Sequence, residues 1–197
     1  MSAGKERVCP VRRAGALDSR IRRWFQDPAK IVGPYIREGM TVLDLGCGPG
    51  FFTVAMAEMV GRRGKVIAAD LQDGMLEKVS EKIRSTHLEN RIRLHKCRAD
   101  GIGFSGTADL VFAFYVLHEV PDQRGLLSEI HALLCDGGYL LIVEPKIVHV
   151  SRAAFERTIG AAVEAGFERS EELRIFLSRG AALRKSAVEV NSGRLVG

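Results

Sequence analysis

A glycine-rich loop directly after a hydrophobic run has the residue types needed to bind a small charged molecule. Asp44 lies at the end of this run, and Gly46, Gly48 and Gly50 follow at alternate positions. Glycines tolerate positive φ and have no Cβ, so a ligand can approach their backbone closely. The dinucleotide fingerprint G-x-G-x-x-G would need its third glycine at Phe51. The early carboxylate would repel a pyrophosphate and suits a cation such as an ammonium. The alternative is an ordinary glycine-rich turn.

Two further acidic residues follow apolar segments that are expected to be strands. Asp70 comes 24 residues after Gly46, which is close to the spacing at which an acid accepts hydrogen bonds from ribose hydroxyls. It could instead cap a helix over residues 73–81. Asp100 precedes Gly101 and could accept a hydrogen bond from the exocyclic amine of adenine, although an Asp-Gly turn explains the same pair.

A histidine after the fourth apolar segment could act as a general base. His118 stands in the sequence Leu-His-Glu-Val-Pro-Asp, and histidine titrates near neutral pH. A loop histidine that bonds only to its neighbours is the alternative reading. Glu119 and Tyr115 are weaker candidates for the same role.

Strands that alternate with helices are expected to position these residues. This alternation predicts a parallel sheet in an α/β fold. The expected strands are 41–45, 65–70, 92–96, 108–114 and 139–144. The expected helices are 52–60, 74–86, 123–134 and 151–165, the last ending at Gly166. Two short strands, 167–176 and 181–185, are expected to form an antiparallel hairpin that turns at residues 178–180.

The ordered series of these motifs resembles the class I S-adenosylmethionine-dependent methyltransferases. The similarity rests on Leu43-Asp-Leu-Gly-Cys-Gly-Pro-Gly50, Val66-Ile-Ala-Ala-Asp70, Ala99-Asp100, residues 108–115 and residues 134–144. The glycine motif alone is moderately specific, whereas the whole series at these spacings is highly specific. The resemblance implies a doubly wound, Rossmann-like, seven-stranded sheet of order 3-2-1-4-5-7-6 with strand 7 antiparallel.

The resemblance also implies how S-adenosylmethionine would be bound. Asp44 and the backbone of the glycine loop would hold the methionine ammonium and carboxylate. Asp70 would hold the ribose. The remaining implied contacts are Gly46, Cys47, Gly48 and Gly50 in the loop, Leu71 and Gln72 beside adenine, and Asp100 and Gly101 at the adenine edge.

The implied reaction is an in-line displacement that leaves S-adenosylhomocysteine. Phe114 and Tyr115 would border the sulfonium, a cation that suits an aromatic wall. His118 and Tyr115 are the expected catalytic residues, and a base is needed only if the acceptor arrives protonated. No metal is expected.

The acceptor is predicted to be a small molecule. The segment 114–122 resembles quinone and sterol methyltransferases, and no Asn-Pro-Pro-Tyr or Asp-Pro-Pro-Tyr motif follows the fourth strand. Two alternatives stay open. One is an RNA or protein methyltransferase, with nucleic acid a less favoured partner. The other is a cofactor-binding domain that is non-catalytic or uses the cofactor for other chemistry.

Charge is concentrated at the N-terminus. Residues 1–30 hold eight Lys or Arg against three Asp or Glu, which accounts for the net charge of +5. A solvated leader is the simplest reading of this arm. With the residues up to 35 it is also a candidate lid, which would include Trp24, Phe25 and Tyr35. Arginines 20, 22 and 23 could attract an anionic acceptor.

Length and composition predict one domain. A chain of 197 residues can bury a substantial core. We expect a methyltransferase domain over residues 36–186 and a loose tail over 187–197. No apolar run reaches the roughly 20 residues of a membrane span. The four cysteines lack C-x-x-C spacing, and Cys47, Cys97 and Cys135 are expected to be buried free thiols, so a cytoplasmic location is expected. A monomer or a homodimer formed through an exposed apolar lead-in helix is equally compatible.

Overall fold

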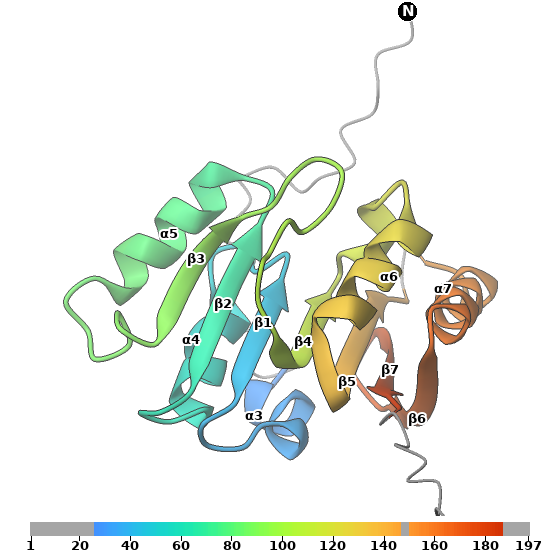
Figure 1. The fold of residues 1–197 in the computed structure, drawn as a ribbon, viewed down its shortest axis with the longest axis horizontal. Coiled ribbons are helices and arrows are strands. Elements are labelled where there is room, and N and C mark those ends of the chain that lie inside the picture. The colour runs from blue at the N-terminus through green and yellow to red at the C-terminus, as the bar shows by residue number, and fades with distance from the viewer. Residues whose placement is uncertain (1–25, 147–149, 187–197) are drawn as a thin grey trace, which may run out of the picture.

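The computed structural model describes residues 26–146 and 150–186, which form a seven-stranded sheet covered by helices (Figure 1). The strand order is β3-β2-β1-β4-β5-β7-β6, and β7 runs antiparallel to both neighbours. The predicted fold is therefore confirmed, strand order included. The strands are β1 (Thr41–Leu45), β2 (Lys65–Asp70), β3 (Ile92–Lys96), β4 (Ala108–Phe114), β5 (Leu134–Pro145), β6 (Phe167–Leu173) and β7 (Ser178–Lys185). The helices are α3 (Pro28–Ile31), α4 (Phe51–Met59), α5 (Asp73–Ile83), α6 (Gln123–Leu133) and α7 (Arg152–Glu164), with 3-10 turns η2 (Gly33–Tyr35) and η3 (Leu117–Glu119).

Helices cover both faces of the sheet, which explains the nearly continuous apolar runs of its central strands. Phe112 of β4 points into a core formed with α3, α4 and α5, while Leu43 of β1 points into a second core formed with α6 and α7. Figure 1 shows α6 in front of the sheet and α4 behind it. A ligand is therefore expected at the carboxyl ends of the strands, where open α/β sheets bind their ligands.

The C-terminal hairpin differs from its prediction. Its turn lies at residues 174–177, so the predicted turn at 178–180 is wrong. Gly180 lies inside β7, where a Cβ would stand only 2.8 Å from the Cβ of Leu173. The glycine is needed for close approach of two strands and not for chain reversal. The fifth strand is also longer than predicted, because Leu134 already pairs with Ala108 before a register shift.

Replacing Gly180 with alanine is expected to destabilise the protein. The added methyl group would force β6 and β7 apart, and overpacking of this kind costs about 1–3 kcal/mol. Urea unfolding monitored by circular dichroism would measure the change. Gly160→Ala is the matched control, since nothing lies within 4 Å of its added Cβ and it sits in α7. This control should be neutral or slightly stabilising because alanine favours helix. Equal stability of the two variants would contradict the packing argument.

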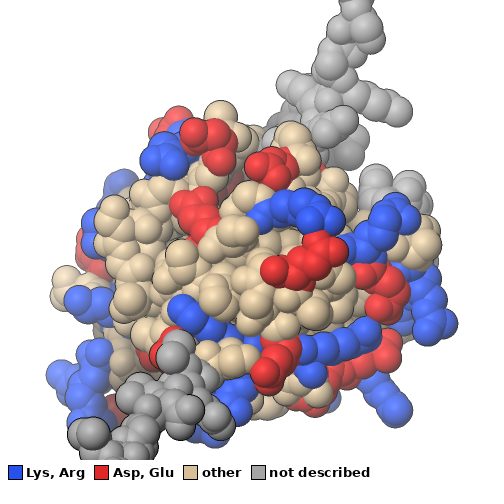
Figure 2. Space-filling model, turned by 45° about the vertical axis from the view of Figure 1, so that its right-hand side comes forward, with Lys and Arg blue, Asp and Glu red and all other residues tan. Residues whose placement is uncertain are grey.

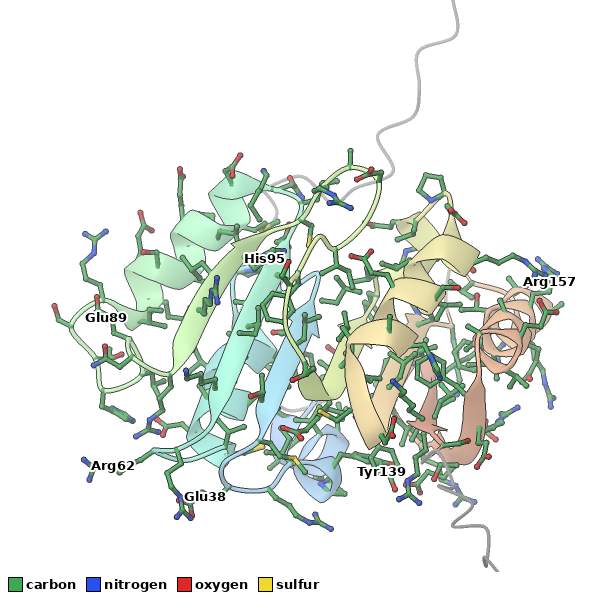
Figure 3. All side chains as sticks on the ribbon, in the orientation of Figure 1. Glu38, Arg62, Glu89, His95, Tyr139 and Arg157 are labelled. Atoms are coloured by element: carbon green, nitrogen blue, oxygen red, sulfur yellow. The ribbon has the colours of Figure 1, made fainter. Side chains whose placement is uncertain are left out.

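The lead-in segment before β1 is part of the core. Ile31 and Val32 are buried against the sheet, so the expectation of an exposed apolar helix is wrong for the described part of this segment. Tyr35 is also buried, and its ring lies 5.3 Å from that of Tyr139. Figure 3 shows Tyr139 at the lower edge of the sheet, which is formed by the amino ends of the strands. Tyr35 is therefore not brought to the carboxyl-end edge.

The other predictions for the N-terminal arm concern residues that lie outside the described part of the chain. These are the basic segment up to residue 25, with Arg20, Arg22, Arg23, Trp24 and Phe25. The predicted tail, residues 187–197, also lies outside it. The predicted boundaries of arm, domain and tail therefore stay predictions.

Candidate active site

The glycine loop joins β1 to α4 at the carboxyl-end edge of the sheet. Gly46, Gly48 and Gly50 have φ values of 68°, 53° and 83°, a left-handed region that strongly favours glycine. Gly50 is the N-cap of α4. A Cβ on Gly46 would overlap the side chain of Val116, whereas one on Gly48 would meet nothing within 4 Å. The loop is thus packed tightly at Gly46 and open at Gly48, where a ligand can approach the backbone.

The amide hydrogens of this loop are used within the protein. The N–H groups of Gly46 and Cys47 donate to the carbonyl oxygen of Ala69, at 2.8 and 3.0 Å. The amide of Gly50 donates to the carbonyl of Cys47 at 3.1 Å. These bonds fix the loop to the end of β2. The loop therefore offers a ligand space rather than unused donors.

Asp70 connects the glycine loop to the segment after β2. Its carboxylate accepts hydrogen bonds from the amides of Gly48, at 3.0 Å, and Gln72, at 2.8 Å. Burial raises the pKa of Asp70, and these backbone hydrogen bonds oppose that rise. An ionised carboxylate can accept about four hydrogen bonds, so capacity for ribose hydroxyls is left. The N-cap of α5 is Gln72, with no side-chain cap bond, so a capping role explains little about Asp70.

Asp44 is almost fully buried at 3% exposure, and the hydroxyl of Thr53 on α4 donates to its carboxylate. Sequence reasoning missed Thr53. A single hydroxyl nine residues after Asp44 gives no sequence signal, because the contact forms only when α4 packs next to the loop. Thr53 therefore fixes the direction of the Asp44 carboxylate, two residues before the first glycine of the loop.

The segment after β2 carries an exposed apolar residue. Leu71 is 40% exposed, one of the few large apolar side chains of the described residues that are exposed, and Gln72 is half-buried beside it. An exposed leucine next to Asp70 is suited to cover the face of a planar base. Cys47 is buried, and burial raises the pKa of its thiol far above its usual range. It is therefore an inert thiol in the loop wall.

Asp100 is placed apart from these groups. Its side chain is 81% exposed and pairs with the Nε of Arg98 at 3.1 Å. The loop around Gly101 is fixed by Glu129 of α6, which accepts from the amides of Ile102 and Gly103 at 2.8 and 2.7 Å. Nothing in the sequence pointed to Glu129. Contacts of Asp100 and Gly101 with adenine remain a prediction.

Aromatic residues end β4 beside the loop. Phe114 is buried between Phe52 and Tyr115, with ring centroids 4.7 and 4.1 Å away. Tyr115 has a φ of 62°, which is strained for a bulky residue. Its hydroxyl lies 2.6 Å from the hydroxyl of Ser178 and accepts a hydrogen bond from Gln26 at 3.0 Å. Tyr115 therefore forms a fixed wall, which fits its predicted place beside the sulfonium better than a role as a base.

His118 forms a pair with a carboxylate that the sequence did not single out. The Nδ1–H of His118 donates a hydrogen bond to Glu144 of β5, and the backbone amide of His118 donates to the other oxygen at 3.3 Å. Glu144 is only 1% exposed. The Nδ1–H bond to this buried carboxylate favours the tautomer with its lone pair on Nε2, and the backbone bond holds the carboxylate in place. This is the arrangement of an oriented general base.

The charges around the imidazole change its basicity. Burial lowers the pKa of His118, but the hydrogen bond and charge of Glu144 and the charge of Glu119 outweigh burial and raise the pKa above its usual value of 6.5. Burial also raises the pKa of Glu119, with His118 opposing it. Glu119 Oε1 lies 4.0 Å from His118 Nε2, too far for a hydrogen bond.

The residues at this edge fit S-adenosylmethionine. Asp44 and Asp70 both act electrostatically on the Cys47 thiol, and Asp70 and Glu144 act on Glu119, so acidic groups lie near one another at this edge, where the backbone is open at Gly48. Among residues 26–146 and 150–186 no group of three His, Cys, Asp or Glu side chains could hold a metal ion. Within the same ranges no helix has the length and apolar character needed to cross a membrane.

Comparisons with known proteins identify the family. Residues 36–176 match the family described as "Methyltransferase domain". The chain is 34% identical over 122 residues to a ubiquinone/menaquinone biosynthesis C-methyltransferase of Enterobacter sp. strain 638, covering 60% of this chain and 49% of the relative. The enzyme of the same name from Klebsiella pneumoniae subsp. pneumoniae is 33% identical over 122 residues, again 60% of this chain and 49% of the relative. The chain thus spans about half the length of the curated relatives that it matches.

A solved structure extends the similarity to most of the chain. A SAM-dependent methyltransferase from Aquifex aeolicus is 26% identical, with a TM-score of 0.80, over 90% of this chain and 100% of that one. Strand order, the glycine loop at the carboxyl-end edge and the matched family agree. The predicted resemblance is confirmed, and the chain belongs to the methyltransferase domain family of class I S-adenosylmethionine-dependent methyltransferases.

Proposed function

We propose that this chain transfers a methyl group from S-adenosylmethionine to a protonated nucleophile on a small molecule. The observation that carries the proposal is the His118–Glu144 pair, which lies beside the glycine loop at the carboxyl ends of β4 and β5. An imidazole oriented by a buried carboxylate is suited to remove a proton. When bound, S-adenosylmethionine supplies an electrophilic methyl group on a sulfonium.

The residues of the chain divide the remaining work. The open backbone at Gly48 and the carboxylates of Asp44 and Asp70 hold the cofactor. Leu71 and Gln72 lie beside the adenine of the cofactor. Phe114 and Tyr115 exclude water from the reacting centre. His118 accepts the proton of the nucleophile on Nε2.

The resulting imidazolium would be stabilised by its neighbours. Glu144 accepts the Nδ1–H bond, and Glu119 adds a second negative charge nearby. Together they favour the charged form of His118 after it has taken the proton.

A small-molecule acceptor is favoured over a nucleic acid. The relatives are named as carbon methyltransferases of ubiquinone and menaquinone biosynthesis. On the face shown in Figure 2, Lys and Arg side chains are interspersed with Asp and Glu around an uncharged centre, which differs from the basic face of most nucleic-acid-binding domains. A cytoplasmic location, and a monomer or homodimer, belong to this proposal.

Release of S-adenosylhomocysteine tests the proposal directly. The purified chain should bind S-adenosylmethionine in calorimetry, and a screen of phenols, quinols and other small nucleophiles should show acceptor-dependent release of the product. Binding without release for every acceptor would favour the non-catalytic domain. Turnover only with RNA or protein would favour the polymer-modifying alternative.

Glu144→Gln is expected to change the pH profile of methyl transfer. A base must be neutral, so the wild-type rate should fall as pH drops below the raised pKa of His118. Glutamine removes the negative charge, so the pKa of His118 falls and the acid limb of the kcat profile moves to lower pH. The plateau kcat should fall about 10- to 100-fold, because a weaker and less oriented base remains.

Glu119→Gln is the comparison for this prediction. It removes a charge near His118 without touching the Nδ1 hydrogen bond, so it should shift the acid limb less and leave the orientation of the ring intact. Cofactor affinity should be unchanged in both variants. A Glu144→Gln profile with the wild-type acid limb would show that Glu144 has only a structural role.

A further inference from the structure

A hollow at the turn between β6 and β7 opens on the same edge of the sheet. Its volume is about 380 Å³, and it is open to solvent rather than enclosed. Apolar walls come from Leu173, Ile175 and Phe176, and Ser178 closes one side. The strands reverse here next to the end of β5, since Ser178 pairs with Pro145.

The tip of this turn has an apolar residue in a conformation that favours glycine. Leu177 has a φ of 53°, and strain of this kind costs about 1 kcal/mol or more for a residue with a Cβ. The turn is closed by hydrogen bonds from Ser178 N to Ile175 O, at 3.2 Å, and from Lys146 N to Leu177 O, at 2.9 Å. Phe176 and Leu177 are nevertheless 57% and 48% exposed. The tip of the turn therefore presents apolar surface that a bound molecule can contact.

The hollow is continuous with the wall of the candidate active site. The hydroxyl of Ser178, which lines the hollow, lies 2.6 Å from that of Tyr115. Tyr115 is the first residue after β4 and stands three positions before His118. A molecule that rests in the hollow and extends past Tyr115 would approach the proposed base.

The rim of the hollow has an excess of positive charge. Lys146 and Arg174 line it, against one carboxylate, Glu172. An anionic group would therefore be favoured at the rim, above the apolar walls.

We propose that this hollow, which we call the turn site, binds the methyl acceptor, and that the acceptor has an apolar body and an acidic group such as a carboxylate, sulfonate or phosphate. This inference rests on the proposed function only in identifying the bound molecule as the methyl acceptor. The turn site itself would bind such molecules in the absence of turnover.

Two fluorescent probes with the same aromatic body test the site. 8-Anilinonaphthalene-1-sulfonate carries an acidic group, and N-phenyl-1-naphthylamine lacks it. Both are titrated into the full chain saturated with S-adenosylhomocysteine, so that the cofactor site is filled. The sulfonate should bind more tightly than the neutral probe.

Three variants distinguish the contribution of the charged rim from that of the apolar walls. Lys146→Gln/Arg174→Gln should weaken the sulfonate about fivefold and leave the neutral probe unchanged, as expected for partly exposed ion pairs. Phe176→Ala removes the exposed ring of the lining and should weaken both probes about fivefold through lost apolar contact. Val163→Ala removes methyl groups from a similarly exposed valine on α7 and should change neither affinity.

Several outcomes would overturn the turn site. Displacement of the sulfonate by S-adenosylhomocysteine would assign binding to the cofactor site, and unchanged affinities in both turn variants would exclude the hollow. Cosedimentation with phosphatidylcholine–phosphatidylglycerol vesicles that Phe176→Ala abolishes, with probe affinities intact, would make the tip a membrane-contacting loop instead. Probe binding that follows the variants in a chain without turnover would refute the proposed function and leave the turn site standing.

Discussion

His118→Asn is expected to lower kcat for methyl transfer by about 10²- to 10⁴-fold, the contribution typical of general base catalysis. The side-chain nitrogen of asparagine can take the place of Nδ1 and keep the hydrogen bond to Glu144. Alanine would instead leave that buried carboxylate without its partner and destabilise the fold. The asparagine variant therefore removes the base while it preserves the structure around it.

Steady-state release of S-adenosylhomocysteine measures the loss, and calorimetry should show cofactor affinity within about twofold of wild type, as expected when binding contacts are kept. His87→Asn is the matched control, since His87 is exposed and pairs with Glu58 far from the glycine loop. A kcat close to wild type in His118→Asn would show that the acceptor needs no base and that proximity alone drives the transfer.

Gly46→Ala is expected to impair both the glycine loop and the position of the base, His118. Its Cβ would overlap Val116, which lies in the segment leading from β4 to His118, and its φ of 68° would add strain. The clash would move Val116 and with it the base, and a misplacement of about 1 Å can cost about 100-fold in rate. We expect kcat/KM to fall about 100-fold or more and Tm to fall with it.

Alanine substitutions at two other glycines distinguish the effect of backbone strain from that of steric overlap. Gly39 has a φ of 91°, and nothing lies within 4 Å of an added Cβ. Gly39→Ala should therefore lower stability through backbone strain without loss of activity. Gly48→Ala also meets nothing within 4 Å, but it fills the space where the cofactor approaches, so it should lose cofactor affinity and keep its fold. If Gly46→Ala behaves like Gly39→Ala, the proposed contact between the loop and Val116 does not control the base.

The parts of the fold governed by local pattern were predictable. The strands 41–45, 65–70, 92–96 and 108–114 match the structure residue for residue. Helix ends were less certain. The helix expected over 74–86 ends at Ile83, where Arg84 becomes extended and Ser85 adopts a positive φ.

The parts of the site that depend on long-range pairing were not predictable. Glu144 was visible only as the charged end of an apolar strand, and its partner His118 is 26 residues away. The two meet because β4 and β5 are neighbours in the sheet. Gly180 was misread for the same reason, since its role appears only when β6 lies against β7.

The raised pKa of His118 links activity and stability in opposite directions. The folded chain holds this proton more tightly than the unfolded chain, so folding takes up a proton near neutral pH. The resulting stabilisation is fully present below the ordinary pKa of 6.5 and is lost as pH rises through the raised pKa. The neutral imidazole that catalysis needs appears over that same interval. The pH at which the enzyme works fastest should therefore lie above the pH at which this proton-linked contribution to folding is greatest.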